Sequence, residues 1–201
     1  YSANEILRAA TELVKEKEFE IALEGFERVL GDIGKSDSQL VEPALMGKGE
    51  ALLELGKKAE AAQALEAIFA KNPRTGRTVK IASLLSRTYA ELASEEPDAD
   101  KRRELFNKSV ENMNIVRKYL KTNEGRAVSD VGVGKIYELK AAAETKFGNA
   151  QEAKQFTGDA IGIYTLLIET GDSNDAKVRP HLEVAFYRCI DLLIKGEFWV
   201  D

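Results

Sequence analysis

The sequence is poor in the residues that interrupt or cross-link a helical chain. Its 201 residues include four prolines, one cysteine and one histidine. The single cysteine, Cys189, cannot form an internal disulfide, so the fold must rest on packing. No run of 18 apolar residues is present, which excludes a membrane-spanning helix. The hydrophobic share of 44% and the charged share of 31% exclude global disorder.

The residues that are abundant favour helices. Ala, Leu, Glu and Lys dominate the composition, apolar residues recur at three- and four-residue spacing, and no segment alternates with a period of two. Ser2 and Glu5 form a capping-box pattern at the start of the first helix. We expect about nine helices, paired as four hairpins plus one unpaired helix. We expect Gly31 and Gly34 to end the second helix and Asn149 to cap the eighth. Residues 121–134 are interpreted as a loop, with an early entry into the next helix as the alternative.

One stretch of the chain has the residue spacing of a known helical repeat. These positions are Gly49, Leu52, Gly56, Ala61, Leu65, Ile68 and Pro73. The spacing resembles the tetratricopeptide repeat (TPR), in which small residues let two antiparallel helices approach closely. Ala10, Leu13, Phe19, Ala22, Phe26 and Val29 match the same template without its glycine and proline, and Ala141, Gly148, Ala153 and Ala160 match it more loosely. The interval from Ala22 to Ala61 is 39 residues, longer than the family period of about 34.

The TPR resemblance implies a fold class and a binding surface. It implies an all-α protein, a right-handed superhelical stack of antiparallel helix hairpins (a TPR-like α-solenoid), forming one domain over residues 1–201 as a fragment of a longer array. Family members mostly bind peptides or proteins on the concave surface lined by the first helix of each pair. The positions implied for that groove are Leu7, Thr11, Val14, Met46, Glu50, Leu53, Lys80, Ser83, Arg87, Lys135 and Glu138.

One specialised form of TPR recognition does not fit. Some members clamp a C-terminal carboxylate with paired Lys, Asn and Arg side chains. Leu7 and Thr11 stand where that clamp needs Lys and Asn, and Gly47 replaces its second Asn. Of the later basic pair only Lys80 matches, so we reject recognition of chaperone tails of that kind.

No set of residues converges on a reaction, a metal or a cofactor. The lone His181 follows a proline at a helix start, and Cys189 lies among apolar residues, so neither indicates catalysis. Gly132-Val133-Gly134-Lys135 lacks the leading glycine and the following Ser or Thr of a phosphate loop. Asp172 and Asp175 lack the other ligands of a calcium loop and favour a capping turn. Lys101-Arg102-Arg103 is interpreted as a solvated helix start. We therefore expect no enzyme activity and no cofactor.

Charge varies along the chain and bears on the partner. Residues 1–70 carry 8 basic and 14 acidic groups, residues 71–126 carry 13 and 8, and residues 127–201 carry 8 and 12. Arg74, Arg77, Lys80 and Arg87 form a basic run in the middle segment, which would attract an acidic ligand. A solvated helix face is the alternative interpretation. The overall net charge of −5 argues against nucleic acid.

The preferred hypothesis is a scaffold or adaptor that binds a protein or peptide. A further hypothesis is that this protein or peptide is acidic. The alternative is a non-catalytic regulatory or recognition segment of a larger enzyme, a transcription factor or an envelope-assembly protein. Self-association through the C-terminal helix is a further hypothesis. If the array continues, we expect Phe198 and Trp199 to pack on the missing partner helix. The composition favours a soluble, cytoplasmic location slightly and leaves a periplasmic one open.

Overall fold

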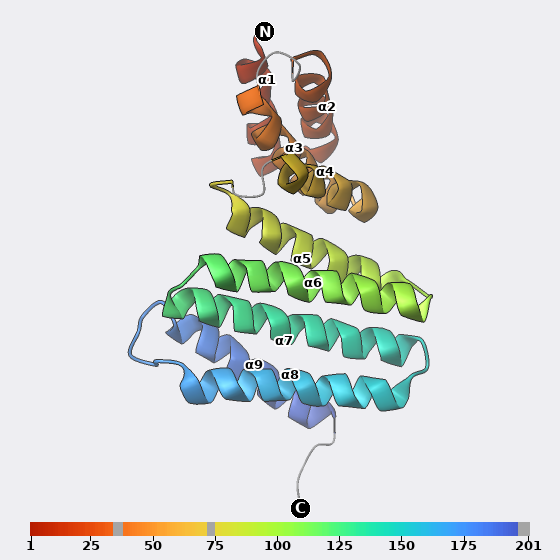
Figure 1. The fold of residues 1–201 in the computed structure, drawn as a ribbon, viewed down its shortest axis with the longest axis vertical. Helices are drawn as coiled ribbons and strands as arrows, with labels where there is room; N and C mark the ends of the chain where they lie inside the picture. Colours follow the sequence, from red (N-terminus) through yellow and green to blue (C-terminus); the bar gives the residue numbers. More distant parts are fainter. Residues whose placement is uncertain (34–37, 72–74, 197–201) are drawn as a thin grey trace, which may run out of the picture. The chain divides into compact units, whose positions relative to one another are not determined.

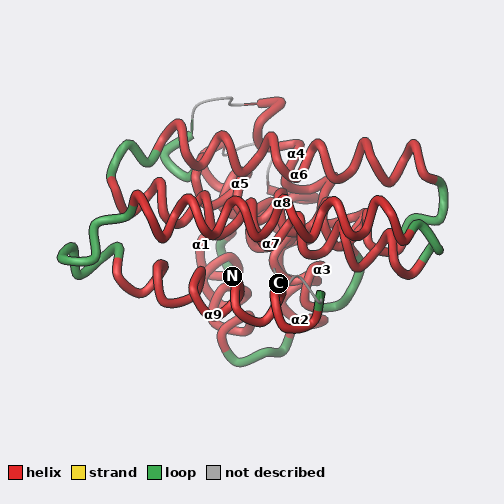
Figure 2. Tube along the Cα trace, turned by 90° about the horizontal axis from the view of Figure 1, so that it is seen from below, coloured by secondary structure: helices red, strands yellow, loops and turns green. Residues whose placement is uncertain are grey.

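The computed structural model describes residues 1–33, 38–71 and 75–196, and within them every regular element is a helix (Figure 2). Nine α-helices and one π-helical turn are present in these ranges. The chain divides into two compact units, Tyr1–Thr88 and Tyr89–Asp201, and the boundary falls inside one helix, α5 (Thr78–Glu95). Each unit is described separately, and the single domain over residues 1–201 stays a prediction.

The first unit contains two helix hairpins. Its elements are α1 (Ala3–Lys15), α2 (Phe19–Arg28), the π turn η1 (Val29–Ile33), α3 (Ser38–Glu54), α4 (Lys58–Lys71) and the beginning of α5. The helix α1 pairs with α2 and α3 pairs with α4, while α3 also packs on both members of the first pair (Figure 1). Contact between successive first helices, here α1 and α3, makes this a stack of hairpins.

Local signals in the sequence explain where the first helices start and stop. The Ser2 amide donates to Glu5 Oε2 at 2.7 Å and the Glu5 amide donates to Ser2 Oγ at 3.4 Å, so the predicted capping box is confirmed. Two turns use left-handed backbone, at Lys17 (φ 64°) between α1 and α2 and at Gly56 (φ 73°) between α3 and α4. Glycine adopts this conformation without strain, which is why Gly56 follows α3.

Small residues lie at the crossings inside each hairpin. A Cβ added at Gly25 on α2 would lie 2.8 Å from the Ala10 Cβ on α1, and one at Gly49 on α3 would lie 2.7 Å from Leu65 on α4. Ala61 is fully buried on α4. The close approach predicted for the second hairpin is therefore present, and the first hairpin uses Gly25 for the same purpose.

The second unit has longer helices. After the last part of α5 come α6 (Ala99–Tyr119), α7 (Asn123–Lys146), α8 (Ala150–Thr170) and α9 (Arg179–Lys195). The helix α7 packs against α6, α8 and α9 (Figure 1). One core cluster joins α5, α6 and α7 through Ala93, Phe106 and Ile136, and another joins α7, α8 and α9. Within the described residues α9 is the ninth helix, as expected from the sequence, and it packs against α8 and α7.

A loop over residues 121–134 is not observed, because α7 already begins at Asn123, and the alternative of an early entry into this helix is confirmed. Thr122 caps this helix by accepting a hydrogen bond from the Gly125 amide at 3.0 Å. The glycines that led to the loop prediction are contact points instead. Gly132 faces Met113 of α6 and Gly134 lies against the Tyr164 ring of α8, so a side chain at either position would collide with its neighbour.

The interpretation of Arg102 as solvated was also wrong, although Lys101 and Arg103 beside it are exposed. The side chain of Arg102 is 2% exposed and pairs with both carboxylate oxygens of Glu144 on α7, at 2.8 and 3.0 Å. Its Nη1 donates to the carbonyls of Glu96 and Pro97, and its guanidinium lies 4.5 Å from the centre of the Phe147 ring. The buried charge is therefore paired and fully hydrogen-bonded.

Three helix-end predictions have other outcomes. Gly31 does not end the second helix, because the chain continues through it as a π turn to Ile33. Asn149 stands at the N-cap of α8, but its side chain makes no cap bond and donates to Glu144 Oε2 at 2.5 Å. Gly34 lies outside the described residues, as do Pro73, Arg74, Phe198 and Trp199.

Candidate protein-binding groove

An open groove of about 600 Å³ runs across the first unit. Its walls come from α1, α3 and the start of α5, and its floor includes one residue of α2. The lining residues are Asn4, Leu7, Arg8, Thr11, Glu12, Val14 and Lys15 on α1, Phe26 on α2, Leu40, Pro43, Met46, Gly47 and Glu50 on α3, and Arg77 and Lys80 at α5. The volume is within the range of sites that bind small molecules or short peptide segments.

The floor of the groove depends on one aromatic ring and one glycine. Phe26 is 1% exposed, and its ring lies directly against the backbone of α3 at Gly47. A Cβ at Gly47 would overlap the ring, so only glycine allows this depth. Leu7 and Leu40 are nearly buried beside the ring, and Met46 is half-buried. The floor is therefore apolar and already formed.

The rim of the groove is charged, with more cations than anions. Four lining residues are basic and two, Glu12 and Glu50, are acidic. Lys80 Nζ lies 2.5 Å from Glu50 Oε1, and Lys15 Nζ lies 2.7 Å from Glu12 Oε1. Arg8 forms no ion pair with any residue that the structure describes. Arg77 Nη1 lies 3.1 Å from Glu42 Oε1, so the excess of positive charge at the rim rests mainly on Arg8.

Six of the eleven predicted groove residues line this groove: Leu7, Thr11, Val14, Met46, Glu50 and Lys80. Three others belong to the same unit and lie elsewhere. Leu53 is 5% exposed and packs in the core with Leu52 and Ala61. Ser83 is half-buried on α5, and Arg87 is exposed with its guanidinium 3.6 Å from Glu54.

The last two predicted residues, Lys135 and Glu138, lie on α7 in the second unit. Lys135 is exposed. Glu138 accepts a hydrogen bond from the Tyr164 hydroxyl at 2.6 Å and lies 3.4 Å from Arg188 Nη1. Burial raises the pKa of Tyr164, and the bond to Glu138 raises it further, so the phenol stays protonated. Glu138 is thus engaged with α8 and α9.

Several groove residues were not predicted from the repeat template. On α1 the predicted residues are Leu7, Thr11 and Val14. Arg8 and Lys15 each follow one of them directly in the sequence and also line the groove. The template marks one residue per turn, and long side chains one position away also reach the groove. The contact between Phe26 and Gly47 joins residues on two different helices, α2 and α3, and the helical period within one helix cannot reveal it.

Reactive side chains do not gather anywhere in the described ranges. Cys189 is buried with its Sγ 3.7 Å from Thr165 Oγ1, and His181 is half-buried at the start of α9. Asp172 and Asp175 accept hydrogen bonds from backbone amides two residues on, as turn residues do. No group of three or more His, Cys, Asp and Glu side chains there could hold a metal ion. None of the helices described is both long and apolar enough to span a bilayer.

The element order and hairpin packing define a class of protein, the TPR-like helical repeats. A solved structure supports this assignment: a thermophilic TPR protein from Thermus thermophilus superimposes with a TM-score of 0.53, covering 92% of this chain and 100% of that one at 16% identity. At that identity the likeness shows the fold alone, so the expected TPR-like α-solenoid fold is confirmed. No family model matches the sequence, and no curated protein matches it either.

Proposed function

We propose that this chain is a binding scaffold that holds a segment of another protein in the groove of its first unit. A TPR-like all-helical fold is typically non-catalytic and indicates protein partners. The observation that carries the proposal is the pre-formed groove, in which Phe26 and Gly47 build an apolar floor beneath a charged rim. A rigid apolar pocket with polar groups at its edge binds with little ordering cost to the protein.

The groove chemistry favours a ligand with one apolar side chain flanked by carboxylates. The apolar side chain would lie over Phe26 and Met46. Its acidic neighbours would meet Arg8, which has no carboxylate at ion-pair distance among the described residues, and Lys80, whose side chain is 55% exposed. A ligand carboxylate at Lys80 adds to or replaces Glu50 as the partner of that cation. Charges at such a rim mainly set specificity and association rate.

This function is the same whether the chain works as a separate adaptor or as the recognition segment of a larger enzyme, transcription factor or envelope-assembly protein. In each case the groove selects the partner, and the chemistry resides elsewhere. The proposal therefore concerns the site, and its test needs only this chain and a defined probe.

The test is fluorescence anisotropy with two labelled peptides of equal length. One peptide has a central leucine between glutamates, and the other has the same leucine between lysines. We expect the acidic peptide to bind, and its affinity to fall as salt screens the rim. Met46→Glu should abolish binding by placing a charge on the apolar floor, and Arg8→Glu should weaken it about tenfold, the effect of losing one charge-assisted contact.

Arg103→Glu is the matched control, since it makes the same charge change at an exposed position of the second unit. It should bind the acidic peptide as well as the parent chain does. Equal binding of the acidic and basic peptides would rule out charge selection. Undiminished binding by Met46→Glu, with its helical circular dichroism intact, would place the site outside this groove.

A further inference from the structure

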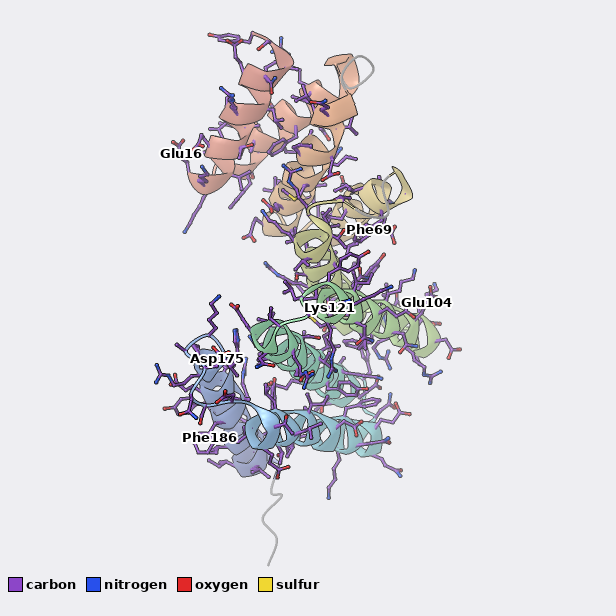
Figure 3. The ribbon with its side chains drawn as sticks, turned by 60° about the vertical axis from the view of Figure 1, so that its left-hand side comes forward. Glu16, Phe69, Glu104, Lys121, Asp175 and Phe186 are labelled. Atoms are coloured by element: carbon purple, nitrogen blue, oxygen red, sulfur yellow. The ribbon has the colours of Figure 1, made fainter. Side chains whose placement is uncertain are left out.

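The helix α9 exposes more apolar surface than any other helix described. Ten large hydrophobic side chains are exposed in the described part of the chain, and five of them are on α9. Tyr187 is 71% exposed, Ile194 55% and Phe186 51%, and Figure 3 marks Phe186 on this helix. Ile190 and Val184 are the other two. Single exposed hydrophobics are ordinary, but a contiguous set on one helix indicates an interaction surface.

The two faces of α9 differ in kind. The face that packs into the second unit carries small residues, Ala185 and Cys189, which lie in the core with Tyr164. The opposite face carries Tyr187, Ile190 and Ile194, spaced by three and four residues. That spacing places their side chains in one line along the helix, as in the seam of a two-helix coiled coil.

We call the line formed by Tyr187, Ile190 and Ile194 the seam, and with Glu183 added its residue spacing is symmetric about its centre. Its positions are then separated by four, three and four residues. A two-fold axis between residues 188 and 189 therefore superimposes the seam on its own reverse, which is what an isologous contact between identical chains requires. On one side of the seam the exposed Phe186 continues the apolar surface, and Leu193 on that side is partly buried against the core of the second unit.

We propose that two copies of this chain associate through α9, packed antiparallel about that axis. Tyr187 of each copy then lies against the partner's Ile190, and Ile194 lies against the aliphatic part of the partner's Glu183. This contact goes beyond the groove function, and it gives the self-association expected from the sequence a specific surface.

Charge favours the antiparallel direction over the parallel one. Glu183 is near the beginning of α9 and Lys195 is its last residue. Antiparallel packing brings each Glu183 beside the partner's Lys195, whose Nζ lies 2.8 Å from Asp191 in its own chain. Parallel packing would instead place the two copies of Glu183 opposite each other, and likewise the two copies of Lys195. Like charges facing across a seam oppose association.

The contact is expected to be weak. One helix of 17 residues spans roughly 25 Å, and a single helix pair buries less surface than most stable dimers do. The dimer should therefore form in a concentration-dependent way. Because the seam is apolar, the dimer should persist in high salt, where binding of an acidic peptide in the groove weakens.

Sedimentation equilibrium of the full chain is the first measurement. The parent chain should pass from monomer to dimer with rising concentration, and Ile190→Glu should stay monomeric. Ile21→Glu is the matched control, because Ile21 is 54% exposed on α2 of the first unit, and it should dimerise like the parent. A parent that stays monomeric at high micromolar concentration, or an Ile190→Glu chain that still dimerises, would overturn the proposal.

Cysteine cross-linking then tests the direction. In a Cys189→Ala background, Tyr187→Cys combined with Ile190→Cys should give covalent dimers on mild oxidation. Ile194→Cys alone should not, because antiparallel packing separates the two copies of residue 194 by about 16 Å along the axis, beyond the reach of a disulfide. Cross-linking of Ile194→Cys would show parallel packing, which also brings the two cysteines of the double variant opposite their own copies, and cross-linking in neither variant would place α9 elsewhere on the partner. Both results overturn the arrangement. Met46→Glu should dimerise normally, so failure of this proposal and failure of the groove are separate outcomes.

Discussion

The two units solve the same packing problem with different residues. In the first unit the paired helices have 13 and 10 residues, then 17 and 14, and cross at glycine or alanine. In the second unit α6, α7 and α8 have 21, 24 and 21 residues. Glycines of α7 make close contacts there, and a buried ion pair between Arg102 and Glu144 adds a polar contact with no counterpart among the ion pairs described in the first unit.

The comparison shows what each solution allows. Close crossings in the first unit leave a groove above Phe26 that small residues keep open. In the second unit the ion pair fixes the register of α6, α7 and the start of α8, because Glu144 also accepts from Asn149. A buried polar network of this kind specifies one arrangement, and its net contribution to stability depends on every partner being present.

The largest expected effect is on the ion pair of the second unit. Glu144→Leu leaves the Arg102 charge buried without its carboxylate and should lower the free energy of unfolding by about 3–5 kcal/mol. The double variant Arg102→Met/Glu144→Leu should recover most of that loss, because no buried charge then remains. Urea denaturation followed by circular dichroism measures both. A single variant as stable as the parent would mean that the pair contributes little.

Overpacking a crossing in the first unit should cost less. Ala61 is fully buried on α4, so Ala61→Leu should destabilise the chain by about 1–3 kcal/mol. Ala59→Leu is the matched control, since Ala59 is exposed on the same helix, and it should change stability little. Hydrogen exchange should locate the loss of protection in α3 and α4. A neutral result at Ala61 would contradict the helix register.

These two predictions also show how much the sequence could reveal. The small residues of the second hairpin follow a known spacing, so Gly49 and Ala61 could be placed from that spacing alone. The pairing of Arg102 with Glu144 could not, because the two residues are 42 positions apart and basic residues at a helix start are usually solvated.

The groove was predictable only in part, for a similar reason. Leu7, Met46 and Lys80, which the repeat template marks, line one groove of the first unit, and their role in binding stays a prediction. The template placed Leu53 there too, although that side chain lies in the core, since helical period alone does not separate two adjacent stripes. The glycines of α7 led to a predicted loop because glycine is common in turns. In this chain they lie inside α7, where side chains of α6 and α8 pack directly against the helix backbone, and the local sequence does not show those neighbours.

Acid should weaken the second unit through Glu144. Hydrogen bonding from Arg102 holds the pKa of Glu144 below its ordinary value of 4.5. A carboxyl with a lowered folded-state pKa stabilises the fold above its unfolded pKa, and that stability is lost as the pH falls through the folded value. The parent chain should therefore lose more stability below about pH 4.5 than the Arg102→Met/Glu144→Leu variant.

The comparison between those two proteins isolates the pair. Burial raises the pKa of Asp130, which acts in the opposite direction, but Asp130 is present in both proteins and cancels. Thermal melts at a series of pH values measure the difference. Parallel pH profiles for the parent and the double variant would contradict a stabilising role for the ionised Glu144.

The smallest predicted change in stability concerns two helical glycines of the second unit, one in open space and one packed against a neighbouring side chain. Gly162 lies on α8 with nothing within 4 Å of an added Cβ, so Gly162→Ala should stabilise the chain by about 0.5–1 kcal/mol through lower chain entropy in the unfolded state. Gly134→Ala makes the same chemical change on α7 against the Tyr164 ring and should destabilise. Opposite shifts in melting temperature are expected, because only the second methyl group has no space. If both variants were stabilised, the Tyr164 ring of α8 would not lie against α7 at Gly134, which would contradict the close packing of these two helices.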